Sequence, residues 1–382
     1  MIRFGTLSII LLLGVVQGVV VTALLMARRD NREANRLLAA LTFAWSLRIV
    51  PYVIGYAGFY DAYPWLSFAP FAITLAYGPL IYLYVVRLTE AALPRRWWLH
   101  LLPAAAQVVY DTAIFVQPLA FKNVWNDTVH RHLIDPAQTI FTFLSLGVYV
   151  VLAARRFRAY GRWLDDATSD AGESRLRWLR NFLVAFALTV ALAAAFETYN
   201  AFVRPLNYYN FFALYVWYAA LVYYLGLEGW RHAGAAYPQP VPVVTRSDPP
   251  PVVAGSVTPP DWPALGRAWR ERVEAGAYWR DPELTLATLA DALGMSPSQT
   301  SRIVNDGLGY NFSEAINRMR VDAVRARLAD PGDRCDVLEI AFDCGFRSKA
   351  SFNRAFKTYA GMTPTEYRRT PYRTTTMRGA DG

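Results

Sequence analysis

Cysteine and histidine are scarce in this chain of 382 residues, which contains two cysteines and four histidines. Cys335 and Cys344 form no CxxC pattern and have no histidine at a metal-ligand spacing, which favours two reduced thiols over a zinc site. A nucleotide-binding glycine loop and a nucleophile signature are also missing. We therefore expect a protein that is not an enzyme and that holds no metal and no cofactor.

Charged residues are also few, at 18% of the chain, whereas 54% of the residues are hydrophobic and the mean hydropathy is +0.17. A soluble chain of this length is normally less apolar. The apolar excess lies almost wholly before residue 228. The net charge of +9 suits an anionic partner, which means nucleic acid, a membrane surface or both.

The first 227 residues contain seven apolar stretches whose lengths approach the roughly 20 residues that a helix needs to cross a bilayer. A secretory signal peptide is the alternative for the first stretch, but its apolar run is too long and six more stretches follow. We predict membrane-spanning helices near residues 4–26, 37–59, 65–86, 97–117, 138–154, 179–203 and 208–227.

The loops between these stretches alternate in positive charge, with thirteen arginines on one side against four basic residues on the other. Because basic loops remain in the cytoplasm, the N-terminus is expected outside, and an odd number of spans places the C-terminus inside. The thirteen are Arg28, Arg29, Arg32, Arg36, Arg87, Arg95, Arg96, Arg155, Arg156, Arg158, Arg162, Arg175 and Arg177, and the four are Arg3, Lys122, Arg131 and Arg204.

Residues 228–262 contain eight prolines and show no helical or strand periodicity. Proline-rich chain is extended, at roughly 3 Å per residue, so we expect a linker here. A ligand for an SH3-type domain is the alternative reading of this composition.

Two similar segments follow the linker, LADALGMSPSQTSRIVN from Leu289 and IAFDCGFRSKASFNRAFK from Ile340. In each, an alanine stands four residues before a glycine, which favours two closely packed helices joined by a left-handed turn. A serine then caps a second helix, and an arginine stands six residues after that serine. These residues are Ala290, Gly294, Ser296 and Arg302 in the first segment and Ala341, Gly345, Ser348 and Arg354 in the second.

The stretch NFSEAINRMRVDAVRARLAD between the two segments has the apolar spacing of a helix. If this helix holds the two units rigidly, their second helices can enter successive major grooves on one face of DNA, about 34 Å apart. Its apolar residues are Phe312, Ile316, Met319, Ala323 and Leu328.

Residues 285–369, and above all the pattern GFxSxxxFxRxFKxxxGxTPxxYR that begins at Gly345, resemble the DNA-binding domain of the AraC/XylS family of bacterial transcription regulators. The stretches YGPLIYLYV (77–85) and HLLPA (100–104) resemble a membrane-bound branch of that family. The expected fold class is all-α, with a seven-helix transmembrane bundle, a Pro-rich linker and a tandem helix-turn-helix domain. The expected boundaries are 1–227 for the sensor domain, 228–262 for the linker, 263–370 for the DNA-binding domain and 371–382 for a flexible basic tail.

The resemblance implies base-facing side chains on both recognition helices. Arginine reads guanine and asparagine can read adenine, each good pair discriminating by about 1–3 kcal/mol, while Lys357 and the helix N-termini at Ser296 and Ser348 suit phosphates. Thr300 departs from the family, which usually has leucine at this position, so we expect looser packing in the first unit. The implied base-facing residues are Ser298, Ser301 and Arg302, with Gln299 nearby, and Lys349, Ala350, Asn353 and Arg354.

Two charged residues, Arg48 and Glu197, fall inside predicted spans. Charge within a membrane is costly and marks a candidate site. We expect an ion pair that stabilises the bundle, and a ligand site is the alternative. The outer loop KNVWNDTVHRHLIDPA is expected to be a solvated loop, with a metal or pH sensor as the alternative; its polar residues are Asp127, His130, His132 and Asp135.

These features together predict a one-component transcription regulator of the bacterial inner membrane, whose seven-span domain senses a signal and whose cytoplasmic domain binds promoter DNA. The expected partners are double-stranded DNA, the lipid bilayer, a small-molecule or envelope signal, and a second copy of the chain in a homodimer. The alternative is a membrane receptor or transporter whose C-terminal helical domain binds a protein partner.

Overall fold

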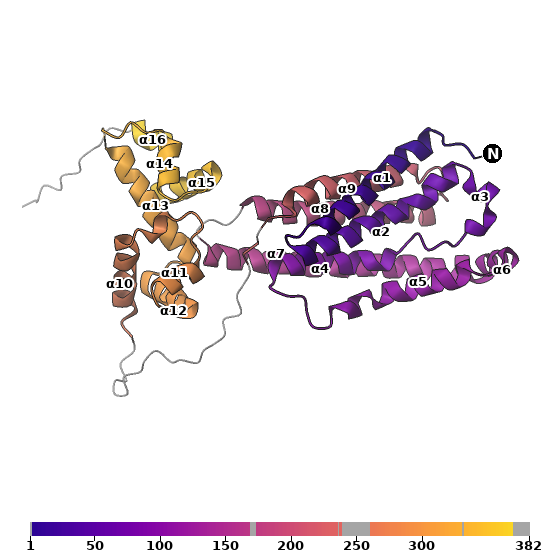
Figure 1. Cartoon of the computed structure of the whole chain (residues 1–382), viewed down its shortest axis with the longest axis horizontal. Coiled ribbons are helices and arrows are strands. Elements are labelled where there is room, and N and C mark those ends of the chain that lie inside the picture. Colours follow the sequence, from indigo (N-terminus) through magenta and orange to yellow (C-terminus); the bar gives the residue numbers. More distant parts are fainter. Residues whose placement is uncertain (1, 169–172, 236, 239–259, 331, 370–382) are drawn as a thin grey trace, which may run out of the picture. The chain divides into compact units, whose positions relative to one another are not determined.

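The computed structural model describes residues 2–168, 173–235, 237–238, 260–330 and 332–369, and every regular element among them is a helix (Figure 1). The chain divides into two compact units. Unit 1 takes in residues 1–160 and 174–241, and unit 2 takes in residues 161–173 and 242–382. Most of the predicted Pro-rich linker and the predicted tail 371–382 lie outside the described residues.

Among the described residues, nine α-helices lie between residues 6 and 232, the last of them reaching into the predicted linker, and three short 3-10 turns and one π-helical segment stand between some of them. The α-helices are α1 (Thr6–Ala27), α2 (Arg32–Tyr56), α3 (Phe59–Ala62), α4 (Tyr77–Thr89), α5 (Leu102–Phe115), α6 (Leu119–Trp125), α7 (Asp135–Ala167), α8 (Glu173–Phe202) and α9 (Phe212–His232), and the shorter segments are η1 (Pro64–Leu66), η2 (Thr74–Ala76), η3 (Trp97–Leu101) and η4 (Asn126–Ile134).

Four helical segments of the described chain are long and apolar enough to cross a membrane. They overlap the first, second, fifth and sixth predicted spans. The third, fourth and seventh predicted spans overlap α4, α5 and α9, of 13, 14 and 21 residues, which do not meet the same measure of length and hydropathy. The four segments are Thr6–Ala27, Arg32–Tyr56, Leu119–Leu164 and Leu176–Phe202.

The third predicted span, 65–86, differs most from its helix, because α4 begins only at Tyr77. Residues 64–76 form the 3-10 turns η1 and η2 with irregular chain between them. Pro64 and Pro70 lack the backbone N–H that a continuous helix would use, which explains the interruption. The apolar character of this segment was therefore no guide to its helicity.

Helix α1 packs closely against α2 and α9 through two glycines. A Cβ atom at Gly14 would lie 2.6 Å from the Cβ of Ala219 on α9, and one at Gly18 would overlap the hydroxyl of Ser46 on α2. Small residues at this four-residue spacing allow such an approach between helices that have no hydrophobic effect to join them, as in a bilayer. The other face of α1 exposes apolar side chains, namely Ile9, Ile10, Leu13, Val16, Val19, Val20 and Leu24.

Unit 2 contains the C-terminal helices, which surround α13 (Phe312–Ala329). The first half of α13 contributes Phe312, Ile316 and Met319 to one apolar core, and its second half contributes Val321, Val324 and Leu328 to another. The structure thus confirms the helix that was predicted to link the two helix-turn-helix segments. The remaining elements are α10 (Trp262–Ala275), η5 (Tyr278–Arg280), α11 (Leu286–Ala292), α12 (Pro297–Arg302), η6 (Ile303–Leu308), α14 (Val337–Asp343), α15 (Lys349–Ala360) and α16 (Pro364–Arg369).

Candidate nucleic-acid interface

Two helix-turn-helix units, α11–α12 and α14–α15, lie toward opposite ends of α13 (Figure 1). The turn of each unit has the same backbone geometry. Gly294 and Gly345 have φ angles of +68° and +84°, a conformation that glycine adopts without steric cost. The following residue in each turn donates its N–H to the carbonyl of the predicted alanine, Met295 to Ala290 at 2.8 Å and Phe346 to Ala341 at 3.1 Å. This is the six-to-one bond of a Schellman motif, and it appears in both units.

Each second helix begins at a serine that accepts a hydrogen bond from the backbone three residues later. Ser296 accepts from the N–H of Gln299 at 3.2 Å, and Ser348 accepts from the N–H of Ser351 at 3.1 Å. The remaining first-turn N–H groups, of Ser298 in α12 and of Lys349 and Ala350 in α15, have no carbonyl partner within the helix, so they can donate to an anion. Both helices therefore present a positive end at a defined place in the unit.

Helix α15 has one buried and one exposed face. Phe352, Ala355 and Phe356 are buried in the second core. The five side chains predicted to meet DNA from this helix are all exposed: Lys349, Ala350, Asn353, Arg354 and Lys357.

Helix α12 is shorter, and it continues into the π-helical segment η6. Ser298, Gln299 and Arg302 are exposed, and Ser301 is partly buried. Thr300 is fully buried, and its hydroxyl has no hydrogen-bond partner among the described residues. The predicted contact residues thus lie away from the core, while the residue that departs from the family leaves a buried polar atom inside it.

Arg302 is held in place by neighbours that the sequence did not reveal. Its Nε lies 3.3 Å from a carboxylate oxygen of Asp306, and its guanidinium lies 4.6 Å from the ring centroid of Trp262 on α10. Helix α10 reaches this position because Gly266 meets Gly307 of η6 so closely that a Cβ on either would clash with backbone atoms. An exposed ion pair of this kind contributes little free energy, so Arg302 can exchange Asp306 for another partner.

Arg320 of α13 is a fully buried arginine that joins the two halves of unit 2. Its Nε donates to the carbonyl of Trp279 at 2.7 Å and its Nη2 to the carbonyl of Asp281 at 2.6 Å. Its guanidinium also lies 5.8 Å from the ring centroid of Phe346, in the second turn. No motif in the sequence singles out this residue, although its register places it on the buried face, four residues after Ile316.

Arg327 ties the end of α13 to α14 and to the loop before it. It donates hydrogen bonds to Asp333 at 2.7 Å and to Asp343 at 2.9 Å. The bond from Arg327, with a second from the backbone N–H of Cys335, lowers the pKa of Asp333 to about 2. The Asp333 carboxylate is therefore charged at neutral pH, and its bond to Arg327 holds the second helix-turn-helix against α13.

The two cysteines of unit 2, Cys335 and Cys344, are thiols rather than thiolates. Hydrogen bonding to Asp333 raises the pKa of Cys335, and burial raises the pKa of Cys344. A protonated thiol is a poor metal ligand. Among the described residues, no group of three histidine, cysteine, aspartate or glutamate side chains could hold a metal ion.

The predicted polar pair of unit 1, Arg48 and Glu197, lines a single cavity. No ion pair or hydrogen bond joins these two side chains among the described residues. Asp135, from the predicted outer loop, lines the same cavity. The segment predicted as a solvated loop is helical instead, and His130 on η4 has its Nδ1 2.9 Å from the hydroxyl oxygen of Tyr110.

Comparison with known proteins identifies the C-terminal segment. Residues 289–370 match a family model described as a helix-turn-helix domain. The melibiose operon regulatory protein of Escherichia coli (strain K12) is 32% identical over 89 residues, which are 23% of this chain and 29% of that protein. An uncharacterized HTH-type transcriptional regulator of Staphylococcus aureus (strain MSSA476) is 33% identical over 86 residues, which are 22% of this chain and 11% of that protein.

No solved structure matches the chain significantly. The chain spans less than a third of the length of the relatives it matches. These relatives are named as transcription regulators and not as enzymes, in agreement with the expectation of a non-enzymatic protein. The C-terminal part of this chain is therefore an AraC-type helix-turn-helix domain.

Proposed function

We propose that this protein is a membrane-embedded, one-component transcription regulator. Its C-terminal domain binds promoter DNA sequence-specifically, and its N-terminal helical unit receives a signal in or across the bacterial inner membrane. The observation that carries the proposal is the pair of matching helix-turn-helix units, each exposing polar and basic side chains from its second helix, fixed at opposite ends of one helix.

The second unit is suited to read bases because its exposed face carries several kinds of side chain. Arg354 can donate two hydrogen bonds to guanine, Asn353 can pair with adenine, and Ala350 can contact a thymine methyl group. Lys349 and Lys357 place positive charge at either end of that face, where it can meet the phosphate backbone. The shared helix α13 and the buried Arg320 hold the two helix-turn-helix units together, as binding of both to successive major grooves requires.

Insertion in a membrane is supported by the apolar surfaces of unit 1. In the segment Leu119–Leu164, only 11% of the most apolar window is buried inside the protein. Contiguous apolar surface of this extent is rare on a protein that faces water. The exposed side chains of α7 include Ile140, Phe141, Leu144, Val148 and Val151.

The predicted orientation is supported by ion pairs between the arginine-rich loops. Arg87 pairs with Glu33, and Arg156 pairs with Glu90 at 2.9 Å. These contacts bring the loops after the first, third and fifth predicted spans to one end of the bundle. Clustered arginines are retained on the cytoplasmic side, which is the compartment of the chromosome.

Control of transcription is proposed to act through the number of DNA-binding domains held together. Two domains tethered to one membrane complex bind adjacent half-sites with an effective concentration set by the tether. A signal that changes the association of two membrane units, as in a homodimer, would then change occupancy of the promoter without a stiff mechanical connection.

The test of this function uses the full-length protein in detergent micelles and a DNA site obtained by genome-wide mapping of bound DNA. Arg354→Ala should weaken binding to the cognate site by about 1–3 kcal/mol and relax preference at one base pair. Lys357→Ala should weaken binding to all sequences alike and lower the slope of log affinity against log salt by about 1. Arg267→Ala, an exposed arginine of α10, serves as the matched control.

Two outcomes would reject the proposal. The first is a folded protein that binds no DNA at any salt concentration but retains a protein partner, which is the receptor or transporter alternative. The second is a reporter fused after Gly382 that is active only on the outer side of the membrane, because the C-terminal domain would then never meet the chromosome.

A further inference from the structure

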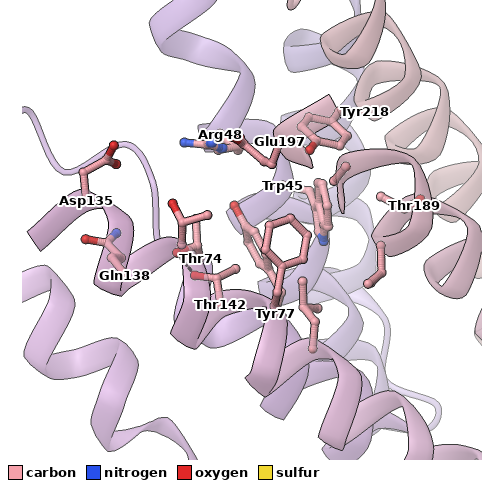
Figure 2. A pocket seen from close by; sticks show the side chains of 15 residues that line it. Trp45, Arg48, Thr74, Tyr77, Asp135, Gln138, Thr142, Thr189, Glu197 and Tyr218 are labelled. Atoms are coloured by element: carbon pink, nitrogen blue, oxygen red, sulfur yellow. Dashed lines mark hydrogen bonds between the residues drawn. The ribbon is translucent and has the colours of Figure 1, made fainter. Parts of the chain in front are cut away.

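Unit 1 contains a cavity among α2, α4, α7, α8 and α9 that combines charged and aromatic side chains (Figure 2). It leaves about 100 Å³ for the centres of water-sized molecules. A single water needs about 10–15 Å³ by that measure, so a small organic molecule has room there. In Figure 2, Arg48 and Glu197 lie next to each other at one edge, and the rings of Trp45, Tyr77 and Tyr218 lie on one side of the space.

The guanidinium of Arg48 is the first unusual feature of this cavity. Among the described residues it makes no hydrogen bond and no ion pair, and its guanidinium carbon lies 5.8 Å from the ring centroid of Tyr215. A guanidinium carries five N–H donors, and Arg48 is half-buried and lines the cavity, so its donors are open to a ligand there. A carboxylate would satisfy two of these donors in a bidentate arrangement.

The second feature is an excess of acidic groups facing the same space. Glu197 of α8 lies beside Arg48 without pairing to it, and Asp135 stands at the first turn of α7. An anion bound to Arg48 would therefore approach carboxylates, which repel it. A ligand that carries its own positive group avoids this conflict, because that group can meet Glu197 or Asp135 while its negative group meets Arg48.

The third feature is the aromatic wall. Trp45 stacks on Tyr77 with ring centroids 4.5 Å apart, and Tyr218 meets Trp45 edge to face at 4.9 Å. All three side chains are buried, so their positions are fixed by packing before any ligand enters. A preformed apolar surface of this kind suits the side chain of a ligand whose polar groups are held elsewhere.

We propose that this cavity binds a small zwitterion of the amino-acid type, with its carboxylate on Arg48, its ammonium group on Glu197 or Asp135, and its side chain against Trp45. Only one part of this proposal rests on the proposed function, namely that the bound zwitterion is the signal to which the regulator responds. Binding itself is a property of unit 1 and needs no DNA.

The position of the cavity agrees with this role. Its lining residues come from the first halves of α4, α7 and α9 and from the second halves of α2 and α8, and the ends of these halves lie away from the arginine-rich loops. In the proposed orientation these ends face the outside. A hydrophilic solute that does not cross the bilayer can therefore reach the site.

The experiment is a titration of the full-length protein, in detergent micelles and without DNA, with each of the common L-amino acids. Binding is followed by calorimetry and by tryptophan fluorescence, since Trp45 lines the cavity. For each amino acid that binds, the corresponding amine without the carboxylate and the acid without the amino group are tested. We expect at least one amino acid to bind saturably, with both analogues weaker by about 10- to 100-fold, as expected from loss of a charge-assisted contact.

Two variants and two matched controls connect that binding to the cavity. Arg48→Met and Glu197→Gln should each weaken the affinity by about 10- to 100-fold. Arg204→Met and Asp127→Asn alter exposed residues outside the cavity and should leave the affinity unchanged.

Three results would overturn the proposal: no amino acid binds to protein that retains its thermal unfolding transition, binding is unchanged in both cavity variants, or the amine-free acid binds as tightly as the amino acid. Because DNA binding is measured separately, failure here leaves the proposed DNA-binding function standing. Loss of DNA binding would equally leave the titration interpretable.

Discussion

Replacing Thr300 by valine tests whether the first helix-turn-helix unit contains an energetic defect. The threonine is 0% exposed, and its hydroxyl has no hydrogen-bond partner among the described residues. A threonine inside a helix commonly donates to the carbonyl four residues earlier, but here the carbonyl of Ser296 accepts only the backbone N–H of Thr300, at 2.9 Å. Valine has nearly the same shape and removes the hydroxyl.

The expected effect is a gain in the free energy of unfolding of unit 2. An unsatisfied buried hydroxyl costs about 1–3 kcal/mol, and replacing it by a methyl group also buries a little more apolar surface. We therefore expect Thr300→Val to stabilise the unit by about 1–2 kcal/mol. For a unit of about 100 residues this raises the unfolding temperature by roughly 4–8 °C per kcal/mol.

The assay is urea-dependent pulse proteolysis of the full-length protein, followed by the disappearance of intact unit 2. Thr358→Val on α15 is the matched control, because that threonine is exposed and its replacement should change stability by less than about 0.5 kcal/mol. DNA affinity should not change, since the Thr300 side chain does not reach the surface. A variant at position 300 that is no more stable than the wild type would refute the reasoning, because the hydroxyl would then have to be satisfied.

Two further predictions concern the same unit. Gly345→Ala should lower the free energy of unfolding by about 3 kcal/mol or more, because its Cβ would lie 2.7 Å from the carbonyl oxygens of Trp279 and Arg280 and the positive φ would be strained. Gly294→Ala has no such contact and should cost only the strain of its positive φ, about 1–2 kcal/mol. The same proteolysis assay compares the two variants, and equal losses of stability would contradict the contact at Gly345. The pKa of Asp333, lowered to about 2 by Arg327, should make unit 2 less stable as the pH falls from about 4, near the ordinary aspartate pKa, toward 2, with this contribution complete above that range. Urea midpoints measured against pH should show less of this loss in Asp333→Asn, while Asp291→Asn should keep it.

The DNA-binding part of the fold could be predicted largely from the sequence, because the signals that specify it are local. The alanine–glycine spacing, the capping serines and the apolar periodicity of residues 312–328 each act within a few turns of chain. The structure reproduces all three. Local signals did not reveal Arg320, whose partners Trp279 and Asp281 lie on a different segment.

The N-terminal helical part was less predictable for a physical reason. Hydropathy reports which segments prefer an apolar environment, but it does not report where a helix is continuous. The segment 65–76 is apolar and mostly irregular, so α4 is shorter than the span predicted there. Whether all seven positions cross a bilayer stays a prediction.

The sequence alone determined that the chain has an apolar helical part and a tandem helix-turn-helix part, because composition and short-range periodicity are written in consecutive residues. Only the tertiary structure decided that Arg48, Glu197 and Asp135 share one cavity without a direct ion pair, and that Thr300 leaves a hydroxyl unsatisfied. These facts depend on how helices distant in sequence pack and on the partners that packing brings within hydrogen-bond distance.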